Sequence, residues 1–129
     1  MYKTGVLNSE VSKILSDLGH TDKIIIADCG LPIPEYVKKI DIALTLGQPS
    51  FLDVFNVIQQ HMVIETMTVA HEIENDNEIL LDKLKATNIA IETVSHERLK
   101  VLSNDVKAVI RTGEATPYAN VILTSGVIF

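Results

Sequence analysis

The sequence predicts an α/β protein. Short apolar segments rich in β-branched residues alternate with amphipathic segments from end to end, which is typical of strands alternating with helices. The segment KIIIAD, residues 23–28, is apolar on both faces, as expected of a strand buried between two layers. With 129 residues and no Pro/Gly/Ser-rich linker, the chain is expected to form one domain over residues 1–129.

The N-terminal part predicts a helix, a strand and a loop in that order. Asn8 suits the N-cap of a first helix with apolar positions at the 3.6-residue period, and Gly19 suits the left-handed residue after its end. His20 therefore follows a helix terminus. The strand at residues 23–28 ends at Asp28, and the two prolines and one glycine of CGLPIP then make a turning loop.

The rest of the chain continues this alternation. Ser50 and Asp53 have the spacing of a capping box at the start of a second helix. Further strands are predicted at residues 40–44, 62–70, 89–94, 108–111 and 121–123, and further helices at 77–86 and 96–102.

The last residues, VILTSGVIF, are unusually apolar for a chain end. Free termini normally fray unless something covers them, so this segment is predicted to be buried. Either it forms a central strand of its own subunit, which we favour slightly, or it contacts another subunit.

Composition and charge argue against several classes of protein. A net charge of −6 without a Lys/Arg cluster repels a phosphate backbone, so nucleic acid is not an expected partner. The apolar runs are too short to span a membrane and no signal peptide is seen, so a soluble, cytoplasmic protein is expected. Cys29 is the only cysteine, and no metal-binding histidine spacing or glycine-rich nucleotide motif occurs, so neither a metal nor a nucleotide cofactor is expected.

His20 and Asp28 are the first candidate functional residues. Taken singly, His20 fits a cation at a helix C-terminus, and Asp28 fits a turn cap. Open α/β sheets bind ligands at the carboxyl ends of their strands, where Asp28 lies, and His20 precedes the same strand. A carboxylate that accepts one imidazole N–H would fix the tautomer of His20 and strengthen its other nitrogen as a base.

Two further groups of polar residues are candidates for ligand binding. His96 and Lys100 lie four residues apart on a predicted short helix and share one face, although most such pairs are merely solvated. The segment IRTGEATPYAN contains Tyr118 and Asn120, and it fits both a sugar-binding edge and an ordinary turn.

Three stretches of the sequence, LNSEVSKILSDLGHTDKIIIADCGLPIP, SHERLK and AVIRTGEATPYANVIL, strongly resemble the D-ribose pyranase family of sugar mutarotases. The resemblance spans nearly the whole chain. It implies a three-layer α/β/α sandwich around a mixed, mainly parallel sheet. It also implies a cytoplasmic homodecamer of two stacked pentamers, and cofactor-free interconversion of the pyranose and furanose forms of free D-ribose in ribose catabolism.

The same resemblance implies a role for each candidate residue. His20 in GHTD would be the catalytic proton donor and acceptor, and Asp28 in ADCG would contact the sugar or orient that histidine. The remaining residues of the sugar pocket would be His96, Lys100, Tyr118 and Asn120.

Two alternatives to a ribose enzyme stay open at this point. Within the same class, the protein would be a mutarotase for another sugar such as L-fucose. In a different class, it would be a non-catalytic sugar-binding accessory to ribose uptake, although the presence of both His20 and Asp28 argues against this.

Overall fold

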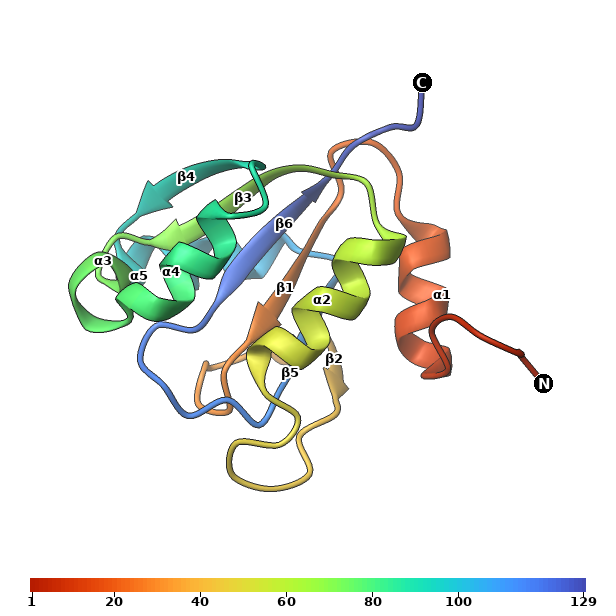
Figure 1. Ribbon diagram of the computed structural model, residues 1–129, viewed down its shortest axis with the longest axis horizontal. Helices are drawn as coiled ribbons and strands as arrows, with labels where there is room; N and C mark the ends of the chain where they lie inside the picture. The colour runs from red at the N-terminus through yellow and green to blue at the C-terminus, as the bar shows by residue number, and fades with distance from the viewer.

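The computed structural model describes residues 1–129 and confirms the α/β prediction (Figure 1). The strands are β1 Lys23–Ala27, β2 Lys38–Asp41, β3 Ile64–Ala70, β4 Ala90–Val94, β5 Ala108–Arg111 and β6 Val121–Ser125. The helices are α1 Ser9–Asp17, α2 Phe51–His61, α3 Ile73–Asp76, α4 Glu78–Lys85 and α5 His96–Leu102, followed by the 3₁₀ turn η1 Ser103–Asp105. None of the helices has the length and apolar character needed to cross a membrane.

The six strands form one sheet in the order β2-β5-β1-β6-β3-β4. β6 is antiparallel to both of its neighbours, and all other strand pairs are parallel, so the sheet is mixed and mainly parallel as expected. We call the end of the sheet where the parallel strands finish the carboxyl end, and the opposite one the amino end. Because β6 runs the other way, residues that precede it lie at the carboxyl end and residues that follow it lie at the amino end.

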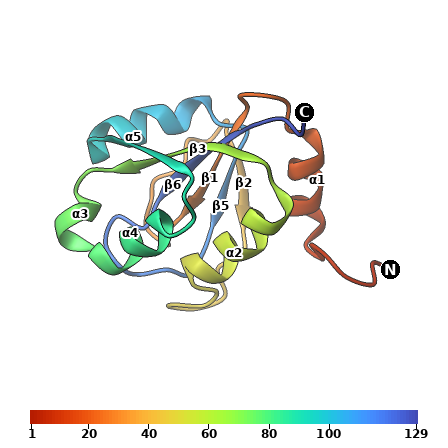
Figure 2. The same ribbon diagram turned by 45° about the horizontal axis from the view of Figure 1, so that its top comes forward.

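The sheet is the middle of three layers, with helices on both faces (Figure 2). α1, α2 and α4 pack on one face, where Ile24 and Ile26 of β1 point into the larger core. α5 and the loop after β1 cover the other face, where Ile25 and Ala27 point into a smaller core. β1 is thus buried on both sides, which explains why its sequence shows no alternation of apolar and polar residues.

The turn after α1 differs from the prediction, because Gly19 does not take the left-handed conformation. Leu18 leaves the helix in an extended conformation, and the positive φ of 69° occurs at Thr21. The Gly19 N–H donates to Asp22 Oδ2 at 2.8 Å, and the Thr21 N–H donates to the Ser125 carbonyl at 2.9 Å. A side chain beyond the turn and the distant strand β6 therefore shape this turn.

β2 begins and ends earlier than the strand predicted at residues 40–44. The chain after β2 folds back over Gly113, whose N–H donates to the Pro49 carbonyl at 2.8 Å. A Cβ at position 113 would overlap the backbone of Gln48, so only glycine permits this approach. The contact fastens the loop after β2 to the segment that leads into β6.

The C-terminal segment divides into two parts. All residues of β6, Val121–Ser125, are buried in the middle of the sheet, which confirms the central strand. The last three side chains are increasingly exposed, at 36% for Val127, 88% for Ile128 and 100% for Phe129. The subunit therefore leaves an apolar tail uncovered at the amino end of the sheet.

Candidate active site

Asp28 and Asn120 form a reciprocal hydrogen-bonded pair at the carboxyl end of the sheet. The Asp28 N–H donates to Asn120 Oδ1 at 2.9 Å, and Asn120 Nδ2 donates to Asp28 Oδ2 at 3.0 Å. Asp28 follows β1 and Asn120 precedes β6, so the antiparallel pairing of these two strands brings them together. The Gly30 N–H donates to the other carboxylate oxygen of Asp28 at 2.9 Å. The carboxylate is therefore fixed before any ligand arrives.

His96 lies at the same end of the sheet, at the start of α5 directly after β4. Its backbone N–H donates to both carboxylate oxygens of Glu72 at 3.1 Å. Its ring meets the ring of Tyr118 edge to face, with centroids 5.0 Å apart and planes at 78°, a favoured geometry for aromatic rings. His96 Nδ1 is buried and has no hydrogen-bond partner. Buried polar atoms are normally paired, so this nitrogen is a candidate contact for a ligand hydroxyl.

Tyr118 has a left-handed backbone conformation with φ of 55°, which is uncommon for a large side chain. The surrounding structure holds it there: the Asn120 N–H donates to the Tyr118 carbonyl at 2.9 Å, and Asn77 Nδ2 donates to the Pro117 carbonyl at 2.9 Å. Strained residues that persist in this way often lie at functional sites. The role of Tyr118 in sugar binding stays a prediction.

Lys100 contacts Glu97 on its own helix, α5. Its ammonium lies 2.8 Å from Glu97 Oε1, and the hydrogen bond from Lys100, with its charge, lowers the pKa of the exposed Glu97 carboxyl below its usual value. The structure shows no bond between Lys100 and His96, Asp28 or Asn120. Its place in the pocket stays a prediction.

His20 lies at the opposite end of the sheet from these residues. It precedes β1, whereas Asp28 follows it, and the five residues of β1 at about 3.3 Å each separate the two by roughly 16 Å. The His20 ring contacts Glu65 instead, with Nε2 and Oε1 3.1 Å apart. The prediction that Asp28 orients His20 is therefore wrong within one subunit, because a residue that precedes a parallel strand lies at its amino end.

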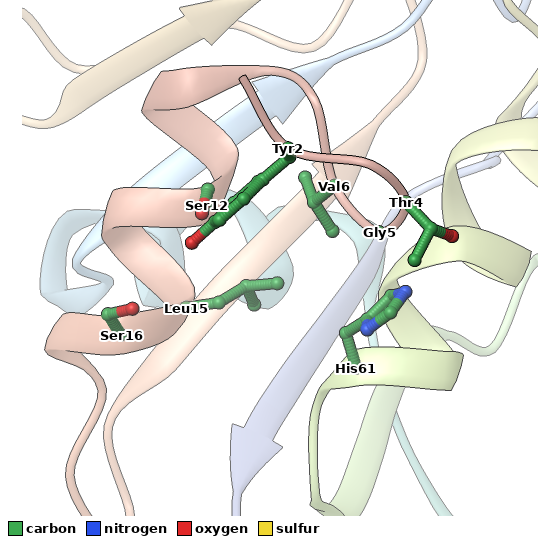
Figure 3. Close-up of a pocket in the computed structure, with 8 residues that line it drawn as sticks. All are labelled: Tyr2, Thr4, Gly5, Val6, Ser12, Leu15, Ser16 and His61. Atoms are coloured by element: carbon green, nitrogen blue, oxygen red, sulfur yellow. The ribbon is translucent and has the colours of Figure 1, made fainter.

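The larger hollows of the subunit do not include the carboxyl-end residues. One of about 440 Å³ lies between the N-terminal segment, α1 and α2, where His61 faces Thr4 (Figure 3). Another, of about 500 Å³, contains His20 and the C-terminal tail. None of five hollows of about 290–500 Å³ contains Asp28, His96 or Asn120. No cluster of three or more His, Cys, Asp or Glu side chains is placed to hold a metal ion.

Comparison with known proteins identifies the family. The model of the RbsD / FucU transport protein family matches residues 1–128. The chain belongs to this family. It is 64% identical over 129 residues to a D-ribose pyranase of Staphylococcus haemolyticus and 59% identical over 131 residues to one of Bacillus cereus, with the whole of each chain covered.

Solved structures of RbsD/FucU proteins share the fold. The structure of Bacillus subtilis RbsD complexed with D-ribose matches with a TM-score of 0.97 and 51% identity, and all of both chains is covered. A fucose mutarotase from Streptococcus pneumoniae in complex with L-fucose matches with a TM-score of 0.78 and 20% identity over 99% of this chain. The first match confirms the predicted fold class, and the second shows that the architecture persists at low identity.

Sequence reasoning missed the residues that hold the PYAN segment of this RbsD/FucU protein. Glu114 accepts from the Phe51 N–H at the start of α2 at 2.9 Å, and from the Thr116 hydroxyl at 2.9 Å. Asn77, between α3 and α4, donates to Thr116 Oγ1 at 3.0 Å. Phe51 lies 63 residues before Glu114, and Asn77 lies 39 residues before Thr116, so no local sequence pattern reveals these contacts.

Replacing Asn120 by alanine is expected to destabilise this RbsD/FucU protein by about 1–3 kcal/mol, because it leaves the part-buried Asp28 N–H and one carboxylate oxygen without their partner. Asn120 is 1% exposed, so water cannot readily take its place. Urea unfolding followed by circular dichroism measures the change. The matched control is Asn56→Ala on the exposed side of α2, which should stay within about 0.5 kcal/mol of the wild type. Equal stabilities of the two variants would contradict the role of the pair.

Proposed function

We propose that this protein is a D-ribose pyranase, an isomerase that interconverts the pyranose and furanose forms of free D-ribose without a cofactor. Full-length relatives named D-ribose pyranase, at 54% to 64% identity, support the proposal, as does the likeness to RbsD complexed with D-ribose. The observation that carries it is the carboxyl-end arrangement. A fixed carboxylate, an amide and an unpaired buried ring nitrogen lie at the same end of the sheet, and such groups suit sugar hydroxyls.

The reaction requires only proton transfers. A base takes the proton of the anomeric hydroxyl, an acid protonates the ring oxygen as its bond to the anomeric carbon breaks, and the open-chain aldehyde forms. The aldehyde rotates, and a different hydroxyl attacks it to close the other ring. One imidazole can take the first proton and return it in the second step, so the sequence is balanced without redox chemistry.

In this proposal His20 is the proton-transfer group and the carboxyl-end residues hold the sugar. Asp28 accepts hydrogen bonds from hydroxyls, and His96 Nδ1 pairs with another. Lys100, Tyr118 and Asn120 limit how the open chain moves, which favours reclosure from a productive geometry.

Because His20 and Asp28 lie at opposite ends of β1, the proposed site needs His20 from a neighbouring copy. Joining the amino end of one copy to the carboxyl end of the next is a head-to-tail contact, and such contacts form a ring when the rotation between copies closes. This geometry supports the ring implied by the resemblance, a pentamer, with two stacked pentamers forming a decamer. The exposed apolar tail beside His20 gives this contact a surface to bury. We place the assembly in the cytoplasm.

Saturation-transfer NMR on D-ribose tests the proposed function. The wild-type protein, far below the sugar concentration, should accelerate exchange between pyranose and furanose signals without shifting their populations. A sugar-binding accessory would change populations only in proportion to its own concentration. A parallel measurement on L-fucose separates the substrates: faster exchange on L-fucose alone would contradict the ribose assignment.

A further inference from the structure

We propose that Glu65 is the positioning residue for His20: it fixes the imidazole tautomer that leaves Nδ1 free to take a proton from the sugar. The inference rests on the proposed pyranase function. It concerns a residue on β3, far along the chain from the GHTD motif, and it replaces the partner that the sequence had suggested, Asp28.

Glu65 lies in an irregularity of the sheet. β3 and β6 pair regularly from Thr66 opposite Thr124 onward, but Ile64 pairs with Ser125. Ile64 and Thr66 are two residues apart, but they pair with adjacent residues of β6, so Glu65 is the extra residue of a β-bulge. Such bulges redirect a side chain and are frequent next to functional sites. Here the redirected carboxylate faces the histidine at the amino end of β1.

Gly126 leaves room for this arrangement. It follows β6 directly, and its N–H donates to the Val63 carbonyl at 2.8 Å. A Cβ at this position would lie 3.1 Å from Val63 Cγ1 and 3.5 Å from Glu65 Cβ. A side chain here would crowd Val63, so the glycine allows the segment after β6 to approach the start of β3 beside Glu65.

The contact itself determines the tautomer. An ionised carboxylate can only accept hydrogen bonds, so at 3.1 Å from Glu65 Oε1 the Nε2 of His20 must carry the hydrogen. In the neutral ring the other nitrogen, Nδ1, is then the unprotonated one, and it makes no hydrogen bond within the chain. The bond at one ring nitrogen thus decides which nitrogen acts as the base.

Stability does not explain the pair. The side chains of His20 and Glu65 are 50% and 48% exposed, and exposed ion pairs contribute little to folding. Glutamate is also disfavoured in strands. A role in the reaction accounts for a carboxylate held at this position, whereas folding alone does not.

The test compares Glu65→Ala with Glu92→Ala, which removes an exposed carboxylate from the neighbouring strand β4. Glu65→Ala should lower kcat for ribose exchange at least about tenfold, within the total that acid–base catalysis supplies, and leave KM unchanged. Glu65→Gln, which keeps an acceptor oxygen, should recover part of the loss. Glu92→Ala should behave as the wild type. A raised KM with unchanged kcat would overturn the proposal, because it would mean that Glu65 binds the sugar.

Two further measurements separate positioning from other roles. In a His20→Ala background, Glu65→Ala should cause no additional loss, and a further loss would overturn the proposal. The ¹⁵N shifts of the His20 ring should show Nε2–H in the wild type and a mixture of tautomers in Glu65→Ala; Nδ1–H in the wild type would also overturn it. If the wild type itself does not accelerate ribose exchange, the proposed function fails, while the ¹⁵N spectra still report on the pair.

Discussion

His20→Ala should lower kcat for exchange between ribose ring forms by about 10²–10⁴-fold, because the variant loses the group that takes and returns the proton. Its fold should survive. The ring is half exposed and its single bond is to another exposed side chain, so the free energy of unfolding should change by less than about 1 kcal/mol. Saturation-transfer NMR gives the rate, and urea unfolding gives the stability.

The control for this variant is His61→Ala. His61 lines the same hollow as His20, but it lies at the end of α2 and has no role in the proposed chemistry. It should keep the wild-type rate. An unchanged rate in His20→Ala, or an equal loss in both variants, would remove His20 from the mechanism.

Mixing two inactive variants should restore activity. His20→Ala lacks the proton-transfer group and Asp28→Ala lacks the sugar carboxylate, so each alone should be nearly inactive. In rings formed from both, some contacts join an intact His20 of one copy to an intact Asp28 of its neighbour. Coexpression, or joint refolding of the two chains, followed by the NMR rate measurement tests this expectation.

The size of the recovery follows from the head-to-tail geometry. Each site takes one face from each of two copies. In an equal, random mixture half of the copies carry an intact His20 and the other half an intact Asp28, so roughly a quarter of the contacts are complete. Activity near a quarter of the wild-type value is therefore expected. No recovery in rings shown by mass to contain both chains would place His20 and Asp28 of a working site in the same copy.

The carboxyl-end residues were predictable from sequence because they follow simple rules. Asp28 directly follows the buried strand β1, and His96 begins the helix after β4, and ligands gather at the ends of parallel strands. The same rule does not apply to His20, because His20 precedes β1 and therefore lies at the amino end of the sheet. The direction of β6, which brings Asn120 beside Asp28, follows from the pairing of distant strands and has no local signature.

Glu65 and Thr21 show what periodicity alone does not reveal. A single glutamate near the start of a strand looks like an ordinary solvent-facing residue, and only the offset pairing with β6 shows that it is redirected. Gly19 was the natural choice for a left-handed residue, but Thr21 takes that conformation because its N–H reaches the Ser125 carbonyl. Both features depend on the end of the chain packing against earlier segments, β3 for Glu65 and the turn after α1 for Thr21.

The position of β6 also sets the moment at which this protein can fold. The strands β2-β5-β1 and the pair β3-β4 are joined in the sheet only through β6, which follows all of them in the chain. On the ribosome, two partial sheets with open edges must therefore wait until β6 has emerged, and contacts between such distant segments form slowly. Until then the open edges are exposed to aggregation, which is the hazard that chaperones counter.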